Sequence, residues 1–154
     1  MKKLPDFEID TALALSTWVE LMKAFNRIRA LELTLIEANG LTIGQFGLLE
    51  LLYHRGEQSI GAATTLAMST PGNMTVVVKN LSKRGLIVTH QNPSDKRSSI
   101  LRITQEGVNI MDGLFPEHSM RIRTFMSGLS VDEQKETQKL LRKLTKSLRG
   151  DHHV

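Results

Sequence analysis

The chain has 154 residues, of which 40% are hydrophobic and 23% are charged, and its formal net charge is +4. These values predict one soluble globular domain. The absence of cysteine excludes disulfides, thiol redox sensing and Cys-ligated zinc. The N-terminus, MKKLPDFEID, has no apolar run, and no segment reaches the roughly 20 apolar residues of a membrane span. We therefore expect a cytoplasmic protein with no membrane partner.

The N-terminal part of the chain predicts three helices. Apolar residues over 18–35 recur at spacings of three and four, which is typical of a long amphipathic helix, and Asn39–Gly40 ends it. Thr42–Gln45 has the form of a capping box for a second helix. Ser59 is suited to cap a short third helix that ends near Ala67.

The stretch STPGNMTVVVKN, residues 69–80, combines turn-forming residues with three consecutive valines. Thr70 is a suitable N-cap, Pro71 suits the first helical position, and Gly85 would end the helix. Because the valines do not alternate with polar residues, the pattern predicts a helix rather than a strand. At about 100° per residue, the inward face holds Met74, Val77, Val78 and Leu81. The outward face holds Gly72, Thr75, Val76, Lys79, Asn80 and Lys83, with Asn73 at its border.

The remaining sequence predicts a β-hairpin and two helices. The β-branched runs LIVTHQN and SSILRIT flank Pro93–Arg97, which we expect to be a charged loop. Thr104 is suited to cap the next helix, which Pro116 should kink or interrupt. A second capping box, Ser130–Glu133, begins the last helix. This helix carries a leucine stripe made of Leu140, Leu141, Leu144 and Leu148.

Basic residues are concentrated in one segment. Between Thr70 and Ile103 there are six basic residues and one acidic residue, whereas the rest of the chain is close to neutral. Such a segment indicates a surface that binds a polyanion. An ordinary solvated face, which is the alternative, would mix the two signs of charge.

The order of these elements is that of a winged helix-turn-helix, in which the second helix of the motif enters the major groove of DNA. We expect Asn73 to pair with adenine, Thr70 or Thr75 to bond to bases or phosphates, and Val76 to meet a thymine methyl. The two lysines of the outward face would neutralise phosphates without reading sequence.

The tip of the hairpin is the second predicted DNA contact. Arg97 would reach a narrow minor groove, and Asp95 is placed to orient it. The complete predicted contact set is Ser69, Thr70, Gly72, Asn73, Thr75, Val76, Lys79, Lys83, Asp95, Lys96 and Arg97.

These segments resemble the MarR family of bacterial transcriptional regulators. The match runs through STPGNMTVVVKNLSKRGLI, NPSDKRSSILRIT and QEG, with an Asp–x–Arg wing signature at Asp95–Arg97, and covers about residues 12–148. The resemblance implies a mainly α fold with a small β-hairpin, as a single domain over 1–154. Within it, the winged helix-turn-helix core would span about 40–104, and N- and C-terminal dimerisation helices about 8–38 and 105–149.

The resemblance also implies a homodimer that binds a pseudo-palindromic operator, usually as a repressor, and that a small acidic or aromatic effector releases. The candidate dimer surface is the leucine stripe with Trp18 and Phe25. The candidate effector pocket comprises Trp18, Phe46, Tyr53, His54, Met111 and Phe115. For both sets the alternative is ordinary packing.

The sequence indicates no catalytic or metal site. There is no Ser/His/Asp order, metal-ligand cluster or phosphate-binding loop, so we expect neither an enzyme nor a cofactor. The five histidines show no ligand spacing beyond His152–His153. The remaining alternative is a winged-helix module for non-specific DNA architecture or protein contact, which the sequence dependence of DNA binding would distinguish.

Overall fold

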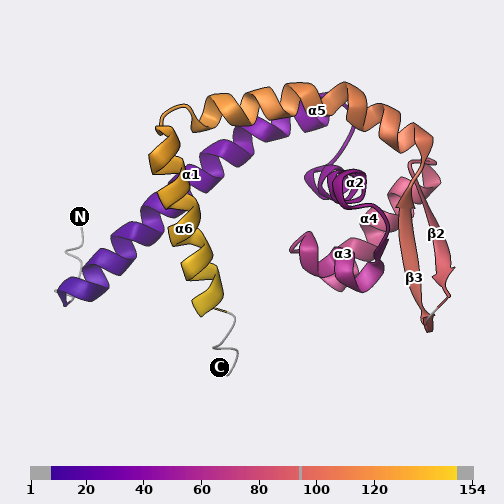
Figure 1. Cartoon of the computed structure of the whole chain (residues 1–154), viewed down its shortest axis with the longest axis horizontal. Coiled ribbons are helices and arrows are strands. Elements are labelled where there is room, and N and C mark those ends of the chain that lie inside the picture. Colours follow the sequence, from indigo (N-terminus) through magenta and orange to yellow (C-terminus); the bar gives the residue numbers. More distant parts are fainter. Residues whose placement is uncertain (1–7, 94, 149–154) are drawn as a thin grey trace, which may run out of the picture. The chain divides into compact units, whose positions relative to one another are not determined.

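A computed structural model describes residues 8–93 and 95–148, including all their side chains except those of residues 95–97. The chain forms two compact units, one ending at Pro116 and the other beginning at Glu117. In chain order the elements are α1 (Ile9–Ala38), α2 (Ile43–Arg55), β1 (Gln58–Ser59), α3 (Ile60–Leu66), α4 (Pro71–Lys83), β2 (Ile87–Asn92), β3 (Asp95–Ile103), α5 (Gln105–Met126) and α6 (Val131–Ser147) (Figure 1). The predicted fold class, mainly α with a small β-hairpin, is confirmed.

These helices begin at the positions that were predicted from their N-capping residues. Thr42 Oγ1 accepts from Gln45 N at 3.3 Å, and Gln45 Oε1 accepts from Thr42 N at 3.0 Å, which completes the capping box of α2. Ser59 Oγ accepts from Ala62 N at 3.1 Å and caps α3. In the second unit, Ser130 and Glu133 form the reciprocal pair that begins α6. The start of each of these helices is therefore determined locally.

Three strands form an antiparallel sheet in the order β1–β3–β2. The β2–β3 hairpin pairs Ile87 with Ile103, and its register becomes irregular between Gln91 and Asn92. β3 already begins at Asp95, so the turn is shorter than the loop expected over 93–97. Antiparallel pairing uses only backbone groups, and charged side chains do not prevent it. The sequence did not predict β1, which pairs Gln58 with Leu101.

The core of the first unit lies between α2, α4, the sheet and the first part of α5. Phe46 and Leu49 of α2 are buried together with Met74 and Leu81 of α4. The largest fully buried side chains are Leu48, Leu49, Leu52, Met74, Leu81, Ile87, Leu101 and Met111. This core fixes the orientation of α4, the helix that carries most of the predicted DNA contacts.

The helix α5 corrects one of the two outcomes expected at Pro116, an interruption, while the kink stays a prediction. The helix runs without interruption through Pro116, although proline cannot donate the backbone bond that would reach the carbonyl of residue 112. The bonds on either side continue the helix. Near its start, Thr104 Oγ1 accepts from Gly107 N at 3.1 Å, which confirms the predicted cap.

Candidate nucleic-acid interface

The first turn of α4 is fixed by residues that precede it. Thr70 is the N-cap, and its Oγ1 accepts from Asn73 N at 3.3 Å. Pro71 occupies the first turn, where its missing N–H leaves no intrahelical bond unmade. The turn-forming residues of this stretch are thus the first turn of a helix.

The two faces of α4 divide as the helical period predicts. Val77 is 6% exposed and packs in the core with Met74 and Leu81, whereas Val76 is 56% exposed. Val78 is partly buried against the same core. The outward residues are Gly72, Asn73, Thr75, Val76, Lys79, Asn80 and Lys83, all of them exposed. The predicted phase of the helix is confirmed.

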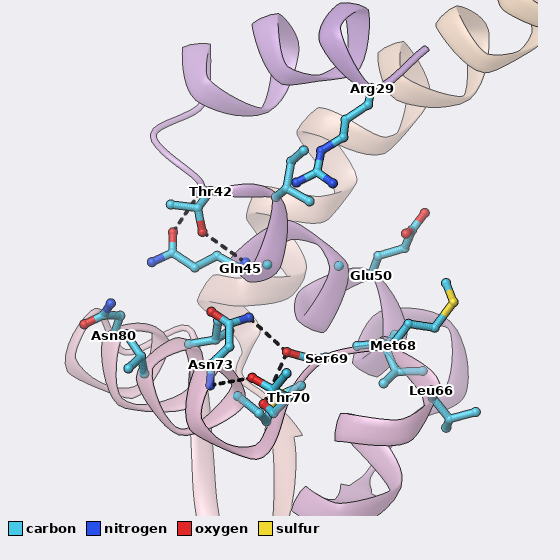
Figure 2. A pocket seen from close by; sticks show the side chains of 18 of the residues that line it. Arg29, Thr42, Gln45, Glu50, Leu66, Met68, Ser69, Thr70, Asn73 and Asn80 are labelled. Atoms are coloured by element: carbon cyan, nitrogen blue, oxygen red, sulfur yellow. Dashed lines mark hydrogen bonds between the residues drawn. The ribbon is translucent and has the colours of Figure 1, made fainter. Parts of the chain in front are cut away.

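Two of the polar groups on this face already have partners within the chain. Asn73 Nδ2 donates to Ser69 Oγ at 2.9 Å (Figure 2). Thr75 Oγ1 donates to the Pro71 carbonyl oxygen at 2.9 Å, so its hydroxyl is left as an acceptor for an incoming group. The amide of Asn73 keeps a second N–H and its carbonyl oxygen.

The basic segment contains residues of two kinds. Lys79 and Lys83 are exposed, and within the described part of the chain neither forms an ion pair. Arg84, by contrast, donates from Nη1 to the Gly40 carbonyl oxygen at 2.8 Å, and Arg102 Nη1 lies 3.7 Å from a carboxylate oxygen of Glu57. Arg84 thus keeps its charge with one N–H donor used within the chain, and Arg102 shares its charge with the carboxylate of Glu57.

The hairpin tip can be located only by its backbone. Residues 95–97 belong to the first part of β3, and Asp95 is the register partner of Asn92. Their side chains lie outside the described part of the chain. DNA contact by Asp95, Lys96 and Arg97 remains a prediction.

The predicted effector-pocket residues are only partly brought together. Phe46 and Met111 are buried in the core, and Trp18 lies exposed on α1. The other three form an aromatic cluster in which the ring centroids of His54 and Phe115 are 4.5 Å apart. Tyr53 meets His54 edge-on at 5.0 Å.

A hydrogen bond gives this cluster a second connection between α2 and α5. Tyr53 Oη donates to Asp112 Oδ1 at 2.5 Å. This bond, with further contributions from desolvation and the carboxylate charge, raises the pKa of the Tyr53 phenol. The bond therefore favours the phenol over the phenolate and links α2 to α5.

The sequence did not predict the groove that lies beside the start of α4. It has a volume of about 1350 Å³ and is open to solvent, and its walls come from α1, α2, the turn after α3 and α4. Figure 2 shows Arg29 of α1 pointing into this groove opposite Asn73, with Ser69 and Thr70 on the same wall as Asn73. Of the six predicted pocket residues, His54 alone lines it. Beside Arg29 in the groove wall is Phe25, whose ring centroid lies 5.9 Å from the guanidinium carbon.

The described residues contain no group of three or more His, Cys, Asp or Glu side chains that could hold a metal ion. Among the same residues, no helix is long and apolar enough to cross a membrane.

Comparison with known proteins agrees with this geometry. Residues 41–99 match the model of the MarR family. The chain is 32% identical over 143 residues to YkoM, an uncharacterized HTH-type transcriptional regulator of Bacillus subtilis (strain 168), and the alignment covers 93% of each chain.

Two solved structures share the fold. Sco3205, a MarR family transcriptional regulator from Streptomyces coelicolor solved in complex with DNA, has a TM-score of 0.82 at 21% identity, covering 92% of this chain and 90% of that one. NadR in complex with 4-hydroxyphenylacetate has a TM-score of 0.75 at 19% identity, covering 95% and 99%. The chain therefore belongs to the MarR family of transcriptional regulators, which are not enzymes.

Proposed function

We propose that this protein is a sequence-specific repressor that binds a pseudo-palindromic operator in the cytoplasm as a homodimer. The observation that carries the proposal is that α4 has one buried face and one exposed face. Its inner residues anchor it in the core, while Asn73, Thr75 and Val76 are exposed beside two lysines that have no ion-pair partner among the described residues. Amide, hydroxyl and methyl groups match the donor, acceptor and methyl pattern of the major groove, and the lysines match phosphates.

The proposal of a homodimer is supported by apolar surface on α1 and, separately, on α6. In the first unit, every residue of α1 from Ile9 to Glu20 is exposed, including Trp18, which is 58% exposed. In the second unit, α6 has no buried residue, and Leu140 and Leu148 are 56% and 62% exposed. Large contiguous apolar surface is uncommon on monomers. A second copy of the chain is the natural occupant, since each copy offers the same surfaces.

Light scattering at micromolar concentration tests this part of the proposal. We expect a mass close to twice the 17.3 kDa of one chain. A mass of one chain would contradict the homodimer, whatever the DNA experiments show.

Sequence-specific DNA binding is tested by substituting the base-facing amide. Asn73→Ala should weaken binding to a selected operator by about 1–3 kcal/mol, the contribution of one bidentate base contact, and leave binding to unrelated duplexes unchanged. Asn80→Ala, about two helical turns further along the same exposed face, is the matched control. Equal affinity for all sequences would favour the alternative, a module for non-specific DNA architecture or protein contact.

We further propose that a small aromatic acid enters the groove beside α4 and releases the operator. NadR binds such an acid, and the groove here is lined by Arg29 and Arg55 against the single acidic residue Glu50. A guanidinium can hold a carboxylate through two parallel hydrogen bonds. Ser69, Thr70 and Asn73 also line the groove, so an occupant would lie against the residues that we expect to contact DNA.

Thermal unfolding with 4-hydroxyphenylacetate and its uncharged amide tests the effector proposal. The acid alone should raise the unfolding temperature, because a ligand that binds only the folded state stabilises it. Arg29→Ala should abolish the shift, whereas Arg27→Ala, which removes a cation of α1 that does not line the groove, should not. Equal shifts for acid and amide, or equal effects of the two variants, would contradict a carboxylate site at Arg29.

A further inference from the structure

We infer that Ser69 is a positioning residue that holds the amide of Asn73 in the orientation that reads an adenine. This inference rests on the proposed DNA-binding function and assigns a role to a residue outside α4. Ser69 lies in the turn before α4, one full helical turn ahead of Asn73, and its Oγ accepts from Asn73 Nδ2 at 2.9 Å.

The hydrogen of the Ser69 hydroxyl has one acceptor nearby, the Thr70 carbonyl oxygen, at the long distance of 3.5 Å. With the hydrogen turned to that side, a lone pair of Ser69 Oγ accepts from the Asn73 amide. Thr70 also accepts from the backbone N–H of Asn73. Both the main chain and the side chain of Asn73 are therefore held by the two residues that precede Pro71, as the dashed lines in Figure 2 show.

Gly44 of α2 lies near the same amide. A Cβ atom added to Gly44 would lie 3.8 Å from Asn73 Nδ2 and 3.1 Å from Val77 Cγ2. The absence of a side chain at Gly44 lets α2 pack closely against the edge of α4 that carries Asn73 and Val77. The amide thus lies between a hydrogen-bond acceptor and a neighbouring helix, although its residue is exposed.

The chemistry of the remaining groups determines what the amide can read. An asparagine side chain offers two N–H donors and one carbonyl acceptor. With one N–H given to Ser69, one donor and one acceptor remain, which is the pair that N7 and the N6 amino group of adenine require. After a 180° rotation the Asn73 carbonyl oxygen would face Ser69 Oγ, and Ser69 would have to turn its hydrogen away from the Thr70 carbonyl oxygen to keep a bond. The rotation would also exchange the positions of donor and acceptor. Ser69 therefore favours one of the two orientations before DNA arrives.

The experiment compares Ser69→Ala, Ser69→Thr, Asn73→Ala and the Ser69→Ala/Asn73→Ala double variant. Fluorescence anisotropy measures the affinity of each for three duplexes: an operator selected with the wild-type chain, that operator with the adenine assigned to Asn73 replaced, and an unrelated duplex. Ser82→Ala is the control, because it removes a hydroxyl from the exposed part of α4 without touching Asn73.

Ser69→Ala should weaken binding to the operator about two- to tenfold, the size of one ordinary hydrogen bond. The loss should disappear on the operator with the replaced base and in the Asn73→Ala background, and Ser69→Thr should restore affinity. An equal loss on all three duplexes, an equal loss in the Asn73→Ala background, or no loss on the operator would overturn the inference. Circular dichroism establishes that each variant is folded.

A second measurement does not depend on DNA. The side-chain amide signals of Asn73 in a ¹⁵N-labelled protein should shift in Ser69→Ala and stay close to wild type in Ser69→Thr. Failure of the proposed function would look different, since the wild-type chain would then bind all three duplexes alike.

Discussion

Two glycines of α5 should respond in opposite ways to the same substitution. Gly107, within the QEG motif, is buried, and a Cβ atom added there would lie 2.4 Å from the Leu86 carbonyl oxygen and 2.7 Å from Ile103 Cγ1. Gly113 is exposed in the same helix, and an added Cβ would meet nothing within 4 Å. The pair separates the effect of close packing from the effect of helix propensity.

The expected magnitudes follow from these distances. The Leu86 carbonyl oxygen that opposes Gly107 also accepts from Thr104 N at 3.0 Å, so relieving the clash disturbs the start of α5. Gly107→Ala should therefore lower the free energy of unfolding by about 1–3 kcal/mol, the usual cost of overpacking. Gly113→Ala should raise it by about 0.5–1 kcal/mol, because alanine loses less backbone entropy in a helix.

Urea unfolding followed by circular dichroism at one fixed protein concentration measures both changes, since association also contributes to stability. Similar slopes of the unfolding curves would show that the variants differ in stability and not in the surface exposed on unfolding. The packing argument is refuted if Gly107→Ala is as stable as the wild type. It is refuted equally if Gly113→Ala loses as much stability as Gly107→Ala.

Three further predictions concern single side chains. Lys79→Ala should weaken binding to all duplexes alike and reduce the dependence of log affinity on log salt by about one unit, whereas an effect confined to the operator would mean that Lys79 reads a base. Tyr53 is the only tyrosine in the chain, so absorbance at high pH follows it alone, and its folded-state pKa should lie above the ordinary value of about 10. Because that pKa is raised, the stabilisation from the bond to Asp112 is complete at neutral pH and is lost as the pH rises through the raised value. Asp112→Asn should move the midpoint of the Tyr53 titration back toward the ordinary value. A wild-type titration midpoint at or below about 10 would contradict the bond. Leu141→Glu should convert the proposed dimer to a monomer in light scattering. Lys146→Glu, which lies on the opposite side of α6 by the helical period, should leave the dimer intact. If the Leu141→Glu variant is still a dimer, α6 does not belong to the interface.

Features set by neighbouring residues were predictable from the sequence. The caps at Thr42 and Ser59 act within three residues, and the sequence located both helix starts. The phase of α4 followed from the placement of its apolar residues, which distinguished Val76 from Val77 before burial was known.

Features that need a distant partner were not predictable. The two-residue strand β1 exists only because Gln58 pairs with Leu101, more than forty positions away. The groove at Arg29 depends on how α1 and α2 pack, which no local pattern reports. Phe46 and Met111 are apolar, and sequence alone does not tell a pocket wall from a core position, whereas the structure buries both.

The central claim is that the exposed start of α4 reads DNA sequence in two symmetric copies. Selection of bound fragments from random duplex DNA by the wild-type chain tests it most directly. The account predicts an enriched inverted repeat whose half-sites are centred about one helical turn, roughly 10 base pairs, apart. Asn73→Ala should then lose the preference at one symmetric pair of positions. Recovery of no motif, or of a single site without an inverted repeat, would contradict it.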